Sequence, residues 1–238
     1  MLNHLRTEDI LFLDIETVPA YADYSQLDER EMMLWNKKAQ HLNTHAAEQP
    51  TPESTYQRAG IYAEFGKIIC ICVGAYTKGV LRVKSFASHN EKELLTDFAA
   101  LLNTYYNQPQ HLLCAHNGKE FDFPFMARRM LINGISLPVM LDMAGKKPWE
   151  IKHLDTMELW KFGDYKNYTS LDLLAHIFNI PSPKDDIDGS EVANVYYKEN
   201  NLARIVKYCA KDVFTLFQIY RRYRGEDLLP AENMQVVN

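Results

Sequence analysis

The chain has 238 residues, of which 47% are hydrophobic and 24% charged, so it has ordinary globular composition and enough length for a substantial core. Its formal charge of −5 argues against a protein that coats nucleic acid through a wide basic surface, but permits a local basic patch. We expect one domain over residues 1–238 with its core at about 10–223. With no signal-peptide h-region and no long apolar run, the sequence predicts a cytoplasmic protein that does not contact a membrane.

The first predicted element is a buried strand over residues 10–18, and it carries two acids, Asp14 and Glu16. Side chains alternate along a strand, so both acids project from one face near its C-terminal end. Like charges in a poorly hydrated place are costly, and a bound cation is the common compensation. Because neither Cys nor His lies in this stretch, the sequence favours Mg²⁺ or Mn²⁺. The alternative is a frayed strand end with two solvated acids.

Residues 19–106 contain the next predicted elements. A long excursion over 19–66 holds a helix at 27–45, broken by prolines at 49–52, and a short helix at 53–62. The pattern then predicts strands at 67–76 and 80–86, joined by a hairpin at 77–79, and a helix at 90–106.

The four cysteines lie in apolar segments without zinc-type spacing. We interpret Cys70, Cys72, Cys114 and Cys209 as buried thiols in a reducing compartment.

A short buried strand at 112–115 leads into a polar stretch that ends at Asp122, and a helix follows at 123–132. Asp122 taken alone has a structural explanation, since it could be the N-cap of that helix. A loop-rich segment follows over 133–153. Helices are then expected at about 155–161, 170–178 and 190–199.

The last predicted helix, 202–223, places polar groups on its apolar stripe. Asp212 lies three or four positions from Cys209 and Leu216, so it falls on the buried side, and Tyr208 precedes it by one turn. Asp212 could alternatively be a half-buried acid paired with a lysine. Together with the earlier acids it makes four carboxylates from three elements, enough to hold two divalent ions. Such a pair of ions clamps the attacking and leaving oxygens of a phosphoryl displacement.

Three segments carry a family resemblance: Asp14-Ile15-Glu16-Thr17, Asn117-Gly118-Lys119-Glu120-Phe121-Asp122, and Tyr208-Cys209-Ala210-Lys211-Asp212. In order and spacing they resemble the motifs of DEDDy 3′→5′ exonucleases, and above all the stand-alone relatives of the proofreading domain of family-B DNA polymerases. Residues 62–69 and 184–190 are similar to that group as well.

The resemblance implies a ribonuclease H-like α/β fold, with a mixed five-stranded sheet and helices on both faces. The residue patterns alone predict four strands, so we place the fifth near 151–154. It implies that Asp14, Glu16, Asp122 and Asp212 bind two divalent cations, Mg²⁺ or Mn²⁺, while Tyr208 positions a water molecule. Asn117 would contact substrate or support Asp122, and Thr17 and Phe121 would be further substrate contacts. Phe121, Phe123 and Phe125 could instead be core residues, and Arg128 and Arg129 a solvated helix face. Only a short tail follows Tyr223, so we expect no polymerase domain there and leave a partner polymerase or repair protein open.

The leading hypothesis is therefore a metal-dependent exonuclease that releases nucleoside monophosphates from single-stranded DNA 3′ ends. An RNA-trimming enzyme of the same architecture is the nearest alternative, because only recognition of the 2′-hydroxyl separates the two. A module that binds nucleic acid or protein without catalysis, or a scaffold that retains only the fold, are alternatives of other classes. Retention of all four acids and Tyr208 counts against the non-catalytic module.

Overall fold

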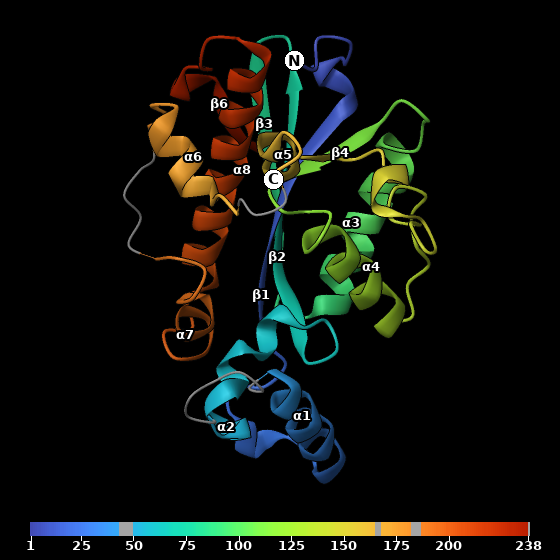
Figure 1. The fold of residues 1–238 in the computed structure, drawn as a ribbon, viewed down its shortest axis with the longest axis vertical. Coiled ribbons are helices and arrows are strands. Elements are labelled where there is room, and N and C mark those ends of the chain that lie inside the picture. The colour runs from blue at the N-terminus through green and yellow to red at the C-terminus, as the bar shows by residue number, and fades with distance from the viewer. Residues whose placement is uncertain (43–49, 165–167, 182–186, 238) are drawn as a thin grey trace.

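A computed structural model describes residues 1–42, 50–164, 168–181 and 187–237, and these form a mixed six-stranded sheet between helices (Figure 1). The strands are β1 (Ile10–Pro19), β2 (Gly66–Thr77), β3 (Val80–Ala87), β4 (Leu112–Ala115), β5 (Leu154–Asp155) and β6 (Met234–Val237). Their order across the sheet is β5-β4-β1-β2-β3-β6.

Strand directions follow from the connections. The hairpin at 77–79 makes β2 and β3 antiparallel, and β2 is also antiparallel to β1. The connection from β3 to β4 carries a helix, and β4 lies parallel to β1 and to β5. The expected α/β class with a mixed sheet is confirmed, but the expected count of five strands is wrong. The described residues contain a sixth, β6, which pairs in parallel with β3.

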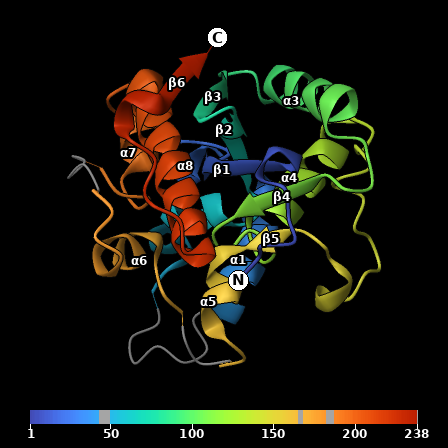
Figure 2. The ribbon, with the colours of Figure 1, turned by 90° about the horizontal axis from the view of Figure 1, so that it is seen from above.

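Helices cover both faces of the sheet, as expected (Figures 1 and 2). One face carries α3 (Glu91–Tyr105) and α4 (Asp122–Ile132), and the other carries α8 (Leu202–Arg224) with α6 (Leu171–Ile177) and α7 (Val192–Tyr197). The short helix α5 (Thr156–Lys161) follows β5.

The excursion after β1 forms α1 (Glu29–Leu42), α2 (Pro52–Thr55) and a 3₁₀ segment, Tyr56–Ile61, at one end of the sheet. The predicted helix at 27–45 is thus found as far as Leu42, and its last residues lie outside the described residues. No helix in the described ranges combines the length and the apolar content that crossing a lipid bilayer requires.

Alternation along β1 divides the core into two clusters. Leu11, Leu13 and Ile15 pack in the cluster that contains the buried residues of α3 and α4. Ile10 and Phe12 pack in the other cluster, which contains the buried stripe of α8. Asp14 and Glu16 continue the alternation of Phe12, so their side chains belong to the α8 face of the sheet.

Candidate active site

Asp122 lies against the part of β1 that β4 leaves uncovered. The β4 pairing with β1 extends over residues 10–12 only. Farther along, the Ile15 backbone N–H donates a hydrogen bond to the Asp122 carboxylate, which places that carboxylate beside the Asp14-Ile15-Glu16 segment. Asp122 is the first residue of α4 and Phe121 is its N-cap, so the alternative that Asp122 is the N-cap is wrong. Asp122 is 4% exposed and Glu16 7% exposed, whereas Asp14 stays half-buried.

The first turns of α8 contribute Tyr208, Cys209 and Asp212 to the same place. The Tyr208 hydroxyl donates a hydrogen bond to the Asp212 carboxylate. The Cys209 thiol donates to the backbone carbonyl of Asp14 over 3.4 Å, which holds α8 against β1 beside the two strand acids. The structure therefore gathers the four acids and the tyrosine from β1, α4 and α8.

Burial and mutual repulsion disfavour ionisation throughout this cluster. The pKa of Asp14 is raised well above its ordinary value, first by burial and then by the charges of Glu16, Asp212 and Asp122. The pKa of Glu16 is raised in the same way by burial and Asp212. Burial also raises the pKa of Asp122 to about 7, although hydrogen bonds from backbone N–H groups oppose the shift. Burial and the nearby acids raise the pKa of Tyr208 too, so its phenol stays protonated at neutral pH.

A cleft of about 560 Å³ opens onto these residues. Its lining includes Asp14, Glu16, Tyr208 and Asp212, together with Thr17, Phe121, Gln57, Arg58, Gly60, Gly189 and Ser190. The pairing of β1 with β2 shifts register between Glu16 and Thr17, and Ile15, Glu16 and Thr17 all reach the cleft. A side chain on Gly60 would meet the Val18 backbone at 2.9 Å, so glycine lets this wall lie directly against the end of β1.

Asn117 does not line the cleft; its amide nitrogen donates to the Tyr168 hydroxyl over 2.8 Å. Its backbone has φ 62°, and its N–H donates to the Asp155 carboxylate over 3.0 Å. The next residue, Gly118, has no room for a side chain, because a Cβ would lie 2.4 Å from that of Ala115. Asn117 and Gly118 thus form a tight turn between β4 and α4, the helix that begins with Asp122.

Asp155 is a fifth acid in this region that sequence reasoning treated only as the start of a helix. It is 2% exposed and accepts hydrogen bonds from the N–H groups of Asn117, Lys119, Met157 and Glu158. Its charge raises the pKa of Asp122, so the two carboxylates lie within electrostatic reach. In the sequence, the only indication that Asp155 is a buried acceptor is its position as a polar residue directly after a short apolar stretch.

Other expected side chains divide between core and cleft. Phe123 and Phe125 are core residues with 0% and 2% exposure, while Phe121 borders the cleft. Arg128 is exposed, as expected for a solvated helix face. Arg129 does not belong to such a face, because it forms a buried ion pair with Glu91. Sequence reasoning missed Gln57 and Arg58, which reach the cleft from the 3₁₀ segment Tyr56–Ile61.

The donor set fits hard divalent cations. Carboxylate oxygens are the ligands that Mg²⁺ and Mn²⁺ prefer, and a cation would offset the repulsion that raises the pKa values of Asp14 and Glu16. Ligand atoms of Asp14, Glu16 and Cys209 lie within 4.8 Å of one another, close enough for one ion to touch both carboxylates.

Two comparisons bear on this arrangement. Residues 61–230 match the family described as predicted 3′–5′ exonuclease related to the exonuclease domain of PolB. The matched residues include Asp122, Tyr208 and Asp212, whereas Asp14 and Glu16 precede them. A family B DNA polymerase from the hyperthermophilic archaeon Pyrobaculum calidifontis shares structural similarity over 87% of this chain, with 14% identity and a TM-score of 0.48. The similarity covers 24% of that polymerase.

The family match spans about seven tenths of the chain and confirms the relationship that the motifs indicated. The chain belongs to the family of predicted 3′–5′ exonucleases related to the exonuclease domain of PolB.

Proposed function

We propose that this exonuclease releases nucleoside monophosphates one at a time from the 3′ end of single-stranded DNA, using two divalent cations. The observation that carries the proposal is the convergence of four carboxylates and one phenol from β1, α4 and α8. Asp14, Glu16, Asp212 and Tyr208 line one cleft, and Asp122 lies beside them without lining it. Four acids kept close together at a cost in free energy are expected where they bind cations.

Asp14, Glu16, Asp122 and Asp212 would hold the cations, Mg²⁺ or Mn²⁺. When bound, two such ions stabilise the charge that develops on the attacking and leaving oxygens of the phosphodiester. The carboxylates themselves act as ligands and do not need to accept a proton from water.

Tyr208 would orient the attacking water. Its raised pKa keeps the hydroxyl protonated at neutral pH, so it acts through hydrogen bonds and not as a phenolate base. The hydrogen bond to Asp212 fixes the position of that hydroxyl next to the acids.

Thr17 and Phe121, which both line the cleft, would contact the terminal nucleotide, and Asn117 would act indirectly by supporting the turn before Asp122. Arg58, exposed at the cleft, supplies a cation for a substrate phosphate. A second groove of about 700 Å³ shares Pro19, Gln57, Ser190 and Ala193 with the cleft and continues it past Tyr24 and Lys198. This groove is the proposed path of the strand leading to the 3′ end.

The four buried free thiols fit a reducing compartment, and we place the protein in the cytoplasm on that ground.

The test is a gel time course with 5′-labelled single-stranded DNA and matched RNA, with Mg²⁺, with Mn²⁺ and with chelator. The proposal expects metal-dependent shortening by one nucleotide at a time, faster on DNA than on RNA. Asp14→Ala should lower the rate at least ~10³-fold, since losing a ligand forfeits several kcal/mol of charge stabilisation. Asp97→Ala, which removes an exposed acid from α3, is the matched control and should behave as wild type.

Faster shortening of RNA would replace DNA by RNA as the substrate. Normal cleavage by Asp14→Ala would refute the ligand assignment. If a folded wild-type protein cleaves neither substrate, the proposed reaction on free 3′ ends is wrong.

A further inference from the structure

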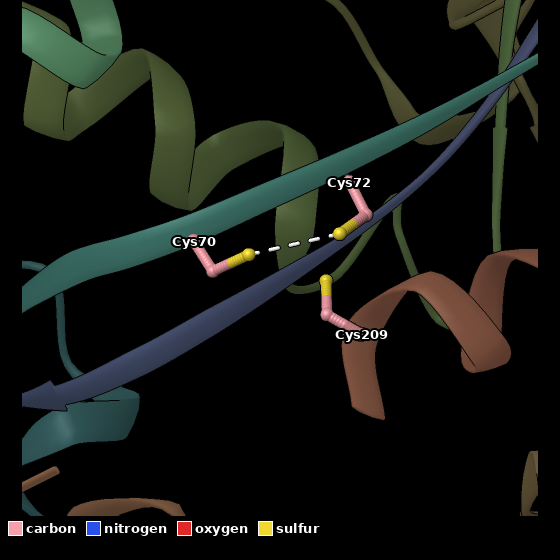
Figure 3. Close-up of side chains that lie close together, drawn as sticks. All are labelled: Cys70, Cys72 and Cys209. Atoms are coloured by element: carbon pink, nitrogen blue, oxygen red, sulfur yellow. Dashed lines mark hydrogen bonds between the residues drawn. The ribbon is translucent and has the colours of Figure 1, made fainter. Parts of the chain in front are cut away.

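Three buried thiols meet between β2 and α8 (Figure 3), and one of them, Cys209, also lies within 4.8 Å of ligand atoms of Asp14 and Glu16. Cys70 and Cys72 are two residues apart on β2, so their side chains project from the same face of the sheet, and Cys209 reaches them from α8. The three sulfur atoms all lie within 4.8 Å of one another, and the Cys70 and Cys72 sulfurs are 3.6 Å apart. All three side chains are 0% exposed.

This spacing is compatible with three thiolates bound to one metal ion. Three thiolates bound to one ion at about 2.3 Å place their sulfurs roughly 4 Å apart. The observed sulfurs need only small side-chain movements to reach that arrangement. Cys114 lies in the same core cluster and represents an ordinary buried thiol, since it belongs to no such group among the described residues.

We propose that Cys70, Cys72 and Cys209 bind a thiophilic cation of the Zn²⁺ or Cu⁺ type. Thiolate ligands select such ions over Mg²⁺ and Mn²⁺, which prefer the oxygen ligands of the neighbouring acids. On binding, each S–H bond is replaced by a sulfur–metal bond, and the protons leave to solvent.

Groups beside the three cysteines can supply a fourth ligand and a route by which the cation enters. The Ser85 hydroxyl lies 3.1 Å from the Cys72 sulfur and offers an oxygen as a fourth ligand. Cys209 also lies within 4.8 Å of the ligand atoms of Asp14 and Glu16, which border the open cleft. A cation that enters through the cleft therefore meets these acids first, and their negative charge favours its passage to the thiols.

The inference does not depend on exonuclease activity, and its test uses no substrate. Full-length protein, kept reduced with a phosphine, is titrated with Cd²⁺ as a spectroscopic probe in the presence of excess Mg²⁺. Thiolate-to-cadmium charge transfer absorbs in the ultraviolet, whereas Cd²⁺ bound to carboxylates gives no such band. Thermal unfolding is followed without added thiophilic metal, with Cd²⁺ and, in a separate sample, with Zn²⁺.

We expect a band that saturates at one equivalent of Cd²⁺ in wild type. Cys209→Ala and Cys72→Ala should lose the band and the thermal stabilisation. Cys114→Ala is the matched control, because it removes a buried thiol from the same core and should keep both. Circular dichroism establishes that each variant is folded, and Cys70→Ala replaces any variant that is not.

Absence of a band in reduced wild type overturns the proposal regardless of the variants. Retention of the band in folded Cys209→Ala, or its loss in Cys114→Ala, overturns the assignment of the ligands.

Discussion

At the scale of one residue, burial and hydrogen bonding act in opposite directions on the pKa of Asp122. The Ile15 N–H stabilises its ionised form, yet the loss of hydration is larger and raises the pKa to about 7. Repulsion from Asp155 acts in the same direction as burial. Without a cation, Asp122 therefore destabilises the folded protein when it is ionised.

The raised pKa of Asp122 makes the free energy of unfolding depend on pH. Because the pKa of Asp122 is near 7 in the folded state and near 3.8 in the unfolded state, the folded state binds more protons between these values. The unfavourable contribution of Asp122 is thus complete above pH 7, decreases as the pH falls below 7, and is absent below the unfolded-state pKa of 3.8. Asp122→Asn should stabilise the metal-free protein at pH 8, and its advantage over wild type should shrink by pH 5.

Urea unfolding with chelator at both pH values measures this difference. Asp97→Asn, at an exposed acid, should show no comparable change. An advantage of Asp122→Asn that is the same at pH 5 and pH 8 would contradict the raised pKa.

Tyr208→Phe removes one hydroxyl and keeps the ring. If that hydroxyl orients the attacking water, kcat should fall about 10²-fold, a typical contribution of a positioned proton donor, while KM changes little. Stabilisation by Mg²⁺ should persist, because all four acids remain. Steady-state kinetics on single-stranded DNA and thermal unfolding with Mg²⁺ provide the readouts. Tyr105→Phe, at a tyrosine 68% exposed on α3, is the control. An unchanged kcat in Tyr208→Phe would remove Tyr208 from the reaction.

Some site residues can be identified from the sequence pattern, and others cannot. Asp14, Glu16 and Asp212 stand out because an acid interrupts an apolar run or stripe, where hydrocarbon is expected. Arg58 follows no such pattern, since an exposed arginine outside regular apolar periodicity is ordinary. The cluster of Cys70, Cys72 and Cys209 is equally hidden, because only the packing of α8 on β2 brings Cys209 to the other two.

At the scale of elements, one buried ion pair joins α4 to α3 and β2. Arg129 forms an ion pair with Glu91 at 2.5 Å, with the side chains 12% and 9% exposed. Arg129 also donates to the Ala63 carbonyl over 2.9 Å, and Glu91 accepts from the Ile68 N–H over 2.7 Å. The pair thus anchors the helix whose first residue is Asp122.

Arg129→Leu should destabilise the protein by about 3 kcal/mol, because it leaves the Glu91 charge buried without its partner. Arg128→Leu changes the exposed neighbour and should stay within about 0.5 kcal/mol of wild type. Urea unfolding at neutral pH measures both. The double change Glu91→Met with Arg129→Leu should recover part of the loss. Equal effects of the two single variants would show that the ion pair does not stabilise the fold.

Strands and helices with a clear apolar pattern were predictable, including the short strand β4, whereas the edge strand β6 was not. The expected strands at 67–76 and 80–86 correspond to β2 and β3, and the expected helix at 202–223 corresponds to α8. β6 escaped prediction because four residues show little periodicity, and its pairing with Leu81, Arg82, Val83 and Lys84 joins distant parts of the chain. β5 was expected near 151–154 and comprises Leu154–Asp155, where pairing with β4 alone defines it.

At the scale of the whole molecule, the acidic cluster links folding to cation binding. The α/β class was predictable because hydrophobic alternation fixes which face of each strand is buried, and that alternation also points Asp14 and Glu16 toward α8. The distances between acids on different elements depend on how those elements pack, which local patterns do not encode. Repulsion within the cluster is therefore a property of the folded molecule and is absent from the unfolded chain.

A cation that binds the folded cluster should stabilise the entire fold by mass action. At a Mg²⁺ concentration 100 times the dissociation constant, the gain for one site is about 2.7 kcal/mol. For a chain of this length that corresponds to a rise in Tm of roughly 5–10 °C. Thermal unfolding across a Mg²⁺ series, and a parallel Mn²⁺ series, should show the rise in wild type and in Asp97→Ala. Asp14→Ala should be more stable than wild type in chelator, because one repelling charge is gone, and should gain little from Mg²⁺. A Tm of wild type that does not respond to either ion, or an equal rise in Asp14→Ala, would show that these acids do not form the cation site.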